Sequence, residues 1–196
     1  MNRLADALAR LLAHLATCGV RGALVGGLAV SARTEPRLTR DLDLAVEVVS
    51  DAEAERLVQR LLALGYATVA IVEHEEAHRL ATVRLRLPGA SGRGVVADLL
   101  FASSGIEPEV VAAAEPLEVF PGVTVPVAQI GHLIALKLLA RDDRTRPQDA
   151  VDLRALRDVA PDAELARARS AVSLIHQRGY ARGRDLAAAL AQWVAL

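Results

Sequence analysis

Two aspartates, Asp41 and Asp43, stand two residues apart in the segment ALVGGLAVSARTEPRLTRDLDLA, which covers residues 23–45. Residues two apart on a strand lie on the same face of a sheet, so both carboxylates are expected to point the same way. Upstream, Gly26 and Gly27 follow a short apolar run and open a helix. A glycine turn at a helix start suits a phosphate group, and a carboxylate pair suits a divalent metal ion. The combination predicts a nucleoside triphosphate held with Mg²⁺ for transfer chemistry.

A third carboxylate is expected from another strand of the same sheet. Asp98 lies in the apolar segment VVADLLF, where an aspartate is costly unless another group compensates its charge. A metal ion would compensate it, so we predict Asp41, Asp43 and Asp98 as metal ligands and catalytic residues. Asp98 could alternatively accept the proton of an acceptor hydroxyl. The competing interpretation is that Asp41 and Asp43 belong with Glu47 to a solvated strand face.

Lysine is used once in the whole chain. Of the 23 basic residues, Lys137 is the single lysine and the other 22 are arginine. Because a compact ammonium group can reach one phosphate oxygen where a planar guanidinium would not fit, we predict a catalytic and nucleotide-binding role for Lys137. Chance survival of one lysine is the alternative.

Further nucleotide-binding candidates flank these residues. Ser31 lies one helical turn after the glycines, and Arg37 and Arg40 precede the carboxylate strand. Asp152 lies among apolar neighbours on a later helix, and a salt bridge from it could orient either Lys137 or Arg141. Asp149 in the same segment has a simpler explanation, because an acid in the first turn complements the helix dipole.

Hydrophobic periodicity places these residues on a mixed α/β framework. Helices are expected over residues 2–17, 27–34, 51–64 and 108–114, and strands over 23–25, 40–49, 66–72, 79–87 and 94–101. An edge hairpin is expected over 117–125, with its turn at Pro121 and Gly122. After Val127 the pattern is helical to the end, over 127–141, 147–159, 163–177 and 184–194. We therefore predict an α/β (α+β) core with a mixed β-sheet and flanking helices over residues 1–126, followed by a helical C-terminal segment over residues 127–196.

Composition narrows the function classes. The net charge of −1 provides no global field for nucleic acid, and 3 % aromatic residues leave few platforms for base stacking. The single cysteine, Cys18, cannot form an internal disulfide, which fits a reducing cytoplasm. Charged residues interrupt the apolar N-terminal segment, so neither a membrane span nor a signal peptide is expected.

Three segments together resemble a known family. GGLAVSARTEPRLTRDLDL, VVADLL and LIALKLLARDDRTRPQDAVDL are similar to the nucleotidyltransferase-fold proteins grouped with the AbiEii/AbiGii toxins, within the DNA polymerase β-like superfamily. The resemblance spans roughly residues 24–156. It departs from many superfamily members at Leu28, where a serine or threonine commonly follows the glycine.

The resemblance implies a fold, a reaction and partners. The metal-binding aspartates fall on Asp41 and Asp43, with Asp98 as the third, and the triphosphate turn falls on Gly26 and Gly27. The later lysine and aspartate fall on Lys137 and Asp152. The implied reaction moves a nucleoside monophosphate from a triphosphate to an acceptor hydroxyl with two Mg²⁺ ions, or Mn²⁺, on tRNA in some relatives, under the restraint of an antitoxin protein.

Two other functions compete with an RNA-modifying toxin. An enzyme of the same fold could adenylylate a small molecule such as an aminoglycoside, which the slight acidity favours, whereas arginines at positions 141, 144, 146 and 154 favour RNA. A non-catalytic regulatory module with this fold is the third hypothesis, and the intact carboxylate set argues against it.

Overall fold

A mixed sheet of seven strands forms the centre of the protein in the computed structural model, which describes residues 3–37, 39, 41–89, 94–142 and 147–195. The strands are β1 (Gly22–Val25), β2 (Leu42–Val46), β3 (Ala67–His74), β4 (Arg79–Arg86), β5 (Val96–Leu100), β6 (Glu115–Phe120) and β7 (Val123–Val127). Their order across the sheet is β3-β4-β5-β2-β1-β7-β6. β2 pairs with β5 and β1 with β7 in parallel, while the other neighbours are antiparallel. The predicted mixed sheet is confirmed.

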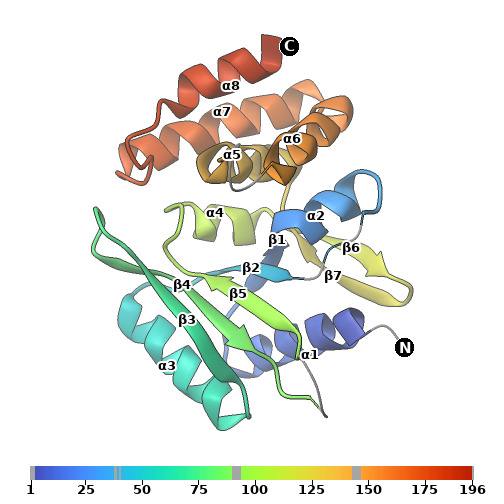
Figure 1. Ribbon diagram of the computed structural model, residues 1–196, viewed down its shortest axis with the longest axis vertical. Coiled ribbons are helices and arrows are strands. Elements are labelled where there is room, and N and C mark those ends of the chain that lie inside the picture. Colours follow the sequence, from blue (N-terminus) through green and yellow to red (C-terminus); the bar gives the residue numbers. More distant parts are fainter. Residues whose placement is uncertain (1–2, 38, 40, 90–93, 143–146, 196) are drawn as a thin grey trace.

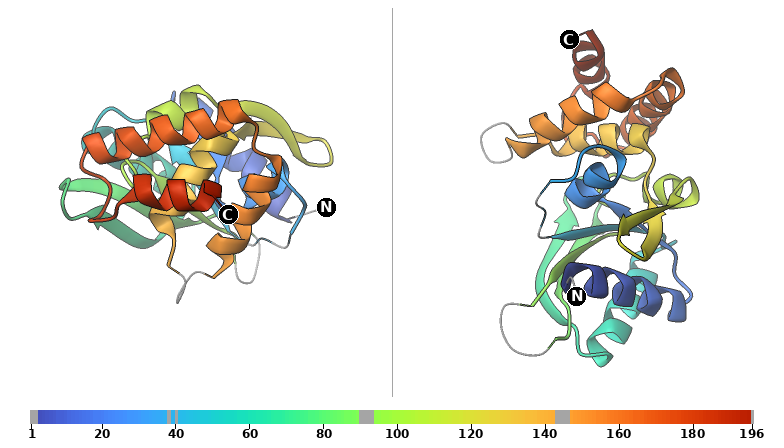
Figure 2. Two further views of the ribbon diagram at one scale, coloured as in Figure 1. Left: turned by 90° about the horizontal axis from the view of Figure 1, so that it is seen from above. Right: turned by 90° about the vertical axis from the view of Figure 1, so that its right-hand side faces the viewer.

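Helices cover both faces of this sheet. Those that alternate with the strands are α1 (Arg3–Thr17), α2 (Gly26–Arg33), α3 (Asp51–Ala63) and α4 (Glu107–Ala112). In Figure 1 and the right-hand view of Figure 2, α1 and α3 lie on one face, and α2 and α4 lie on the other. The leucines of α1 keep helical spacing and are buried at Leu8, Leu11 and Leu15, so the amphipathic stripe of the sequence packs into the core.

Four helices follow the last strand. They are α5 (Ile130–Ala140), α6 (Gln148–Val159), α7 (Asp162–Gln177) and α8 (Leu186–Ala195), and they gather at the end of the molecule opposite α1 and α3 (Figure 1). Among the described residues, every strand precedes residue 128, so the change of element type falls at the predicted boundary near residue 127. The division into two folding units stays a prediction.

The C-terminal helices are bound to one another and to the core. The indole N–H of Trp193 on α8 donates to the carbonyl of Leu153 on α6 at 3.2 Å, and both residues are buried. α5 is buried nearly all round, with Leu133, Ile134 and Ala135 inaccessible to solvent. It thus forms the floor of the helical layer, over the face of the sheet that carries α2. Within the described part of the chain, no helix is long and apolar enough to span a bilayer.

Candidate active site

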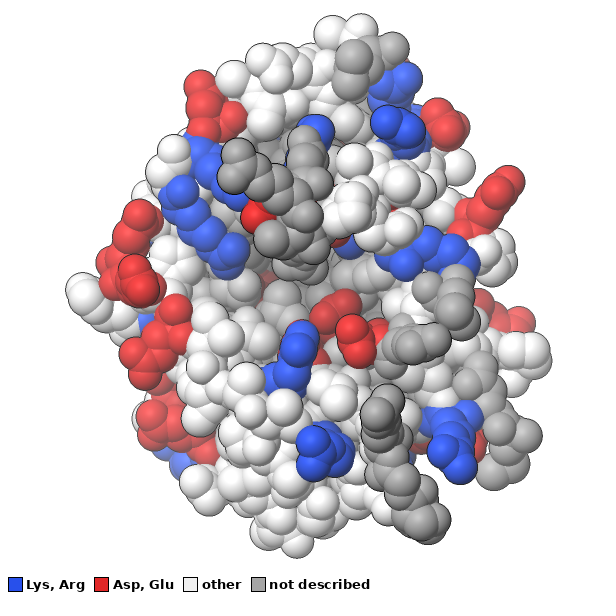
Figure 3. Space-filling model, in the orientation of Figure 1, with Lys and Arg blue, Asp and Glu red and all other residues white. Residues whose placement is uncertain are grey.

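A cavity of about 510 Å³ lies between the sheet and the helical layer, and we call it the central cavity. The polar residues that line it are Arg37, Thr39, Asp41, Asp43, Thr82, Asp98, Ser103, Ser104, Lys137, Gln148, Asp149 and Arg182. They come from seven different parts of the chain. On the face drawn in Figure 3, acidic side chains lie in the middle and basic side chains lie around them.

The three predicted carboxylates line this one cavity. Strands β2 and β5 run parallel, and their register sets Asp43 directly beside Asp98. Asp41 immediately precedes β2, two residues before Asp43 in sequence. The prediction that the third carboxylate belongs to a neighbouring strand of the same sheet is confirmed, because the crossover between β2 and β5 brings positions 55 residues apart in sequence into register.

Charged side chains pack closely against both glycines of the turn, Gly26 and Gly27. Gly26 has φ +66°, and a β-carbon there would lie 2.6 Å from Cγ of Asp43. A β-carbon on Gly27 would lie 2.5 Å from Nη2 of Arg37. The turn between β1 and α2 therefore needs two glycines, because a carboxylate approaches one of them and a guanidinium approaches the other.

Asp98 carries an ion pair that was not predicted. Arg84 on β4 lies opposite Asp98 on β5 and donates from Nε to Oδ1 at 2.7 Å and from Nη2 to Oδ2 at 2.6 Å. The hydrogen bonds that Arg84 donates to Asp98, together with the charge of that carboxylate, raise the pKa of Arg84, and the nearby Asp41 and Asp43 carboxylates raise it further, while burial lowers it. The sequence predicted a metal ion as the compensating charge for Asp98, whereas the structure shows a guanidinium in that place.

Lys137 belongs to a buried network of four charges. Its ammonium group donates to Oδ1 of Asp149 at 2.7 Å and lies 2.7 Å from Oδ2 of Asp152. Arg37 donates to both oxygens of Asp152 at 2.8 Å. The predicted salt bridge between Asp152 and Lys137 is present, and Asp149 does more than complement a helix dipole. The network fixes both cations on the wall of the central cavity.

The structure does not bring every predicted residue to the cavity. The hydroxyl of Ser31 donates to the carbonyl of Gly27 at 3.1 Å, one turn back in α2, and Ser31 is not among the residues that line the cavity. Asp152 is only 1 % exposed and stands behind Lys137 and Arg37 rather than at the surface of the cavity. Arg40, together with the arginines at positions 144 and 146, lies outside the described residues.

The residues present fit a divalent metal ion held by few protein ligands. As the side chains stand, the described residues contain no group of three acidic, histidine or cysteine side chains gathered around one point, and both oxygens of Asp98 are engaged by Arg84. Mg²⁺ nevertheless commonly takes one or two carboxylates and completes its shell with substrate phosphates and water. Asp41 and Asp43 provide two such donors, and the Asp43 carboxylate packs directly against Gly26 of the glycine turn.

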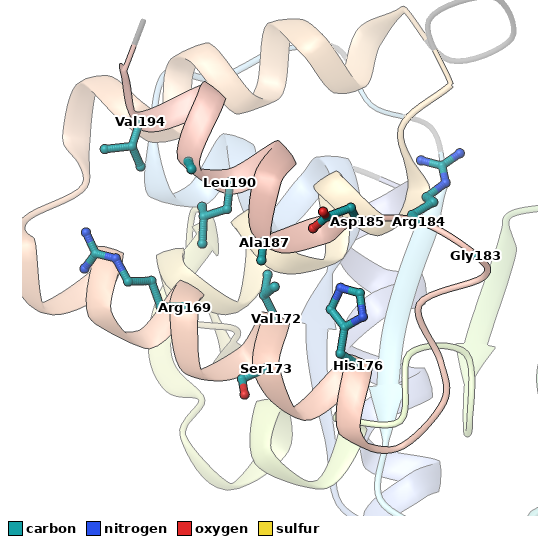
Figure 4. Close-up of a pocket in the computed structure, with 11 residues that line it drawn as sticks. Arg169, Val172, Ser173, His176, Gly183, Arg184, Asp185, Ala187, Leu190 and Val194 are labelled. Atoms are coloured by element: carbon teal, nitrogen blue, oxygen red, sulfur yellow. The ribbon is translucent and has the colours of Figure 1, made fainter.

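A second cavity, of about 1000 Å³, lies between α7 and α8 (Figure 4). Its walls are largely apolar, with Val172, Leu190 and Val194 among them. Its polar groups have structural partners: Nε2 of His176 accepts from the amide of Leu186, and Oδ1 of Asp185 accepts from the amide of Ala188 at the start of α8. We therefore place the reaction in the smaller central cavity, which contains the carboxylates.

The sequence analysis did not identify two arginines at this site: Arg182, which lines the central cavity, and Arg84, which pairs with the lining residue Asp98. Arg84 could have been found, because the predicted hairpin of residues 79–87 and 94–101 sets it opposite Asp98 once the register is fixed at the turn. Arg182 could not, because it reaches the cavity from the loop between α7 and α8 and donates to the carbonyl of Ser103 at 2.7 Å. No local pattern in the sequence predicts that distant contact.

Comparisons with known proteins agree with the geometry. The chain resembles a solved antigenic nucleotidyltransferase-like protein from Paracoccidioides brasiliensis, with 18 % identity over 96 % of this chain and 92 % of that one and a TM-score of 0.56. It also resembles the antibiotic-resistance factor ANT(2″)-Ia, solved with adenylyl-2″-tobramycin, with 17 % identity, 97 % and 98 % coverage and a TM-score of 0.50. At these identities, both show the fold alone. No curated protein sequence matched.

The family model for the nucleotidyl transferase AbiEii toxin of type IV toxin–antitoxin systems matches residues 8–193, nearly the whole chain. The match includes the glycine turn, the three carboxylates and the Lys137 network. The chain therefore belongs to the AbiEii nucleotidyltransferase toxin family and is a nucleotidyltransferase.

Proposed function

We propose that this protein transfers a nucleoside monophosphate from a nucleoside triphosphate to an acceptor hydroxyl, with divalent metal bound in the central cavity. The observation that supports it best is the close approach of Asp43 to the glycine turn, with Asp98 in register beside it. This arrangement sets carboxylates next to a backbone shaped for phosphate. In the reaction, the acceptor oxygen forms a bond to the α-phosphorus, and the bond to the pyrophosphate oxygen breaks.

The glycine turn would hold the triphosphate. α2 begins at Gly26, and its N-cap residue, Val25, makes no side-chain hydrogen bond to the helix end. The amides of the first turn are therefore available to phosphate oxygens, and the helix dipole favours the negative charge. Leu28 is 6 % exposed and points into the core, so a phosphate contact from a side chain at that position is missing.

The three carboxylates would have two roles, metal binding and proton transfer. Asp41 and Asp43 would hold two Mg²⁺ ions, or Mn²⁺, together with the phosphate oxygens. Bound metal supplies positive charge where the α-phosphate and the leaving pyrophosphate are negative. Asp98 would accept the proton of the acceptor hydroxyl or become the third ligand, and in both roles the proton or the metal would compete with Arg84 for the Asp98 oxygens.

Lys137 and Arg37 would contribute positive charge near the phosphates. Both line the central cavity, and Asp152 holds both through hydrogen bonds of 2.7–2.8 Å. Asp152 is therefore a positioning residue for the nucleotide rather than a direct ligand. A fixed cation costs less reorganisation than a mobile one when the triphosphate enters.

For the acceptor, we propose tRNA, and for the partner, a cognate antitoxin protein. The family name, which describes a nucleotidyl transferase toxin of a toxin–antitoxin system, supports the antitoxin partner. The tRNA acceptor follows only from the resemblance of the sequence to relatives that modify tRNA. A second candidate is a small hydroxyl-bearing antibiotic. It is supported by the similarity in fold to ANT(2″)-Ia, which extends over 97 % of this chain and 98 % of that one.

One assay distinguishes the acceptors. The protein is incubated with Mg²⁺ and each α-labelled triphosphate in turn, with total RNA in one series and with aminoglycosides in the other. We expect label in the tRNA fraction and pyrophosphate release that depends on added metal. Label on the aminoglycoside alone would favour the second candidate, and no label with any triphosphate would refute the proposed activity.

A further inference from the structure

The ion pair between Arg84 and Asp98 is placed by the sheet itself. The two residues are direct neighbours across the antiparallel strands β4 and β5. Both oxygens of the carboxylate accept from the guanidinium, at 2.7 and 2.6 Å. A bidentate pair of this kind occupies the lone pairs that a metal ion or an incoming hydroxyl would use. Asp98 thus cannot bind metal through these lone pairs until Arg84 releases it.

The two partners differ in exposure. The Asp98 side chain is 15 % exposed, whereas the Arg84 side chain is 46 % exposed. The carboxylate lines the central cavity, while the guanidinium pairs with it from the neighbouring strand and is not itself among the lining residues. A half-exposed arginine can move into water at modest cost, because water solvates its charge well once it leaves the carboxylate. The pair is therefore suited to open when a stronger cation arrives.

Arg84 also lies within the field of the other two carboxylates, since Asp41 and Asp43 both raise its pKa. The neighbouring cations of the cavity have different partners: Arg37 and Lys137 are paired with Asp152, and Lys137 also with Asp149. Arg84 thus neutralises one of the carboxylates at the proposed metal-binding end of the cavity. It occupies the place of positive charge that a metal ion would take.

We propose that Arg84 is a positioning residue that holds Asp98 in the nucleotide-free protein and competes with metal for its oxygens. This inference rests on the proposed metal-dependent transfer. Its consequence is that metal binds weakly alone and enters together with the triphosphate, whose phosphates supply the missing ligands. The released guanidinium then lies beside Asp98 and can donate to a phosphate of the nucleotide or of the acceptor.

Direct Mn²⁺ binding to the nucleotide-free full chain tests the proposal, with free Mn²⁺ followed by electron paramagnetic resonance. We expect Arg84→Ala to bind Mn²⁺ about fivefold more tightly than the parent, as loss of a weak competing ion pair implies. Arg84→Lys, which can engage only part of the carboxylate, should fall in between. Equal or weaker binding by both variants would overturn the proposal. If Arg84→Ala does not fold, Arg84→Lys alone decides in the same way.

Arg79→Ala is the matched control. Arg79 lies on the same strand and is 35 % exposed, but the carboxylate it pairs with at 2.6 Å, Asp51, does not line the central cavity, whereas Asp98 does. It should bind Mn²⁺ as the parent does. In an Asp98→Asn background, Arg84→Ala should no longer increase affinity, because there is no carboxylate to release. An increase that persists there would show that Arg84 acts by its general field and would overturn the positioning role.

The experiment separates this inference from the proposed function. Asp41→Asn/Asp43→Asn should abolish Mn²⁺ binding in both the parent and the Arg84→Ala background. Mn²⁺ binding that persists in the double variant would refute the metal site on which the proposed function depends. If the double variant loses Mn²⁺ binding but Arg84→Ala gains no affinity for Mn²⁺, the Arg84 inference is refuted while the proposed metal site stands.

Discussion

The side chain of Asp43 lies so close to Gly26 that it excludes any larger residue at position 26. A β-carbon there would stand 2.6 Å from Cγ of Asp43, well inside van der Waals contact, and the backbone already has φ +66°. The glycine turn and the carboxylate pair, which are separate motifs in the sequence, are therefore one structural unit. Triphosphate and metal are expected to meet at this unit.

Gly26→Ala should abolish transfer and lower the free energy of unfolding by more than a backbone effect alone. Gly19→Ala is the control, because Gly19 has φ +75° but open space around its Cα. We expect about 1 kcal/mol of destabilisation for Gly19→Ala, with activity intact. Urea unfolding and the transfer assay measure both. Equal destabilisation and equal activity in the two variants would show that the approach of Asp43 is unimportant.

Asp152→Ala should destabilise the protein by about 3 kcal/mol, because it leaves Arg37 and Lys137 partly unpaired in a buried network. Glu47→Gln is the comparison, since Glu47 pairs with Arg21 at the surface and its loss should cost less than about 0.5 kcal/mol. The triphosphate KM of Asp152→Ala should also rise. Chemical denaturation of both variants tests this, and similar unfolding free energies would contradict the role of the network.

Ser31→Ala should leave transfer within about twofold of the parent, because small surface or helix substitutions away from a site have small effects. The Ser31 hydroxyl donates to the carbonyl of Gly27 and does not line the central cavity. Steady-state kinetics decide the matter. A large rise in the triphosphate KM would show that Ser31 contacts phosphate, as the sequence predicted.

His132 should make stability depend on pH. Burial on α5, together with the nearby charge of Arg167, lowers the pKa of His132 from 6.5 to about 4, although Glu164 and Glu109 oppose the shift. Between pH 6.5 and 4 the unfolded chain binds more protons than the folded chain. The free energy of unfolding is therefore highest above pH 6.5 and falls by about 3 kcal/mol as the pH drops to 4. Unfolding of His132→Leu across this range should show a smaller fall. An identical pH dependence in parent and variant would contradict the assignment.

The sequence predicts most of this fold because its signals are local. The leucine spacing of residues 2–17, the apolar strands and the late helical pattern each correspond to an element of the structure. The prediction errs mainly at strand ends: β2 stops at Val46 instead of Val49, where its pairing with Gly22 ends. The carboxylates were found for the same reason, since strand alternation alone gives Asp41 and Asp43 a common side.

The charged partners within the site were harder to predict. The pairing of Asp98 with Arg84 depends on hairpin register, and the pairing of Lys137 with Asp149 depends on how α5 packs on α6. Lone charges in apolar segments showed that compensation was needed, but they did not show which group supplies it. Arg182 depends on a loop that folds back over 79 residues to Ser103, which no short-range pattern encodes.

The most direct test of the account is transfer of label from an α-labelled triphosphate to RNA, with the parent and with Asp41→Asn/Asp43→Asn. Both carboxylates line the central cavity, and β2 packs the apolar residues Leu42 and Leu44 into the core, so the double variant should keep the fold and its urea midpoint. We predict metal-dependent labelling by the parent and none by the double variant. Equal labelling by the two proteins would contradict the central claim.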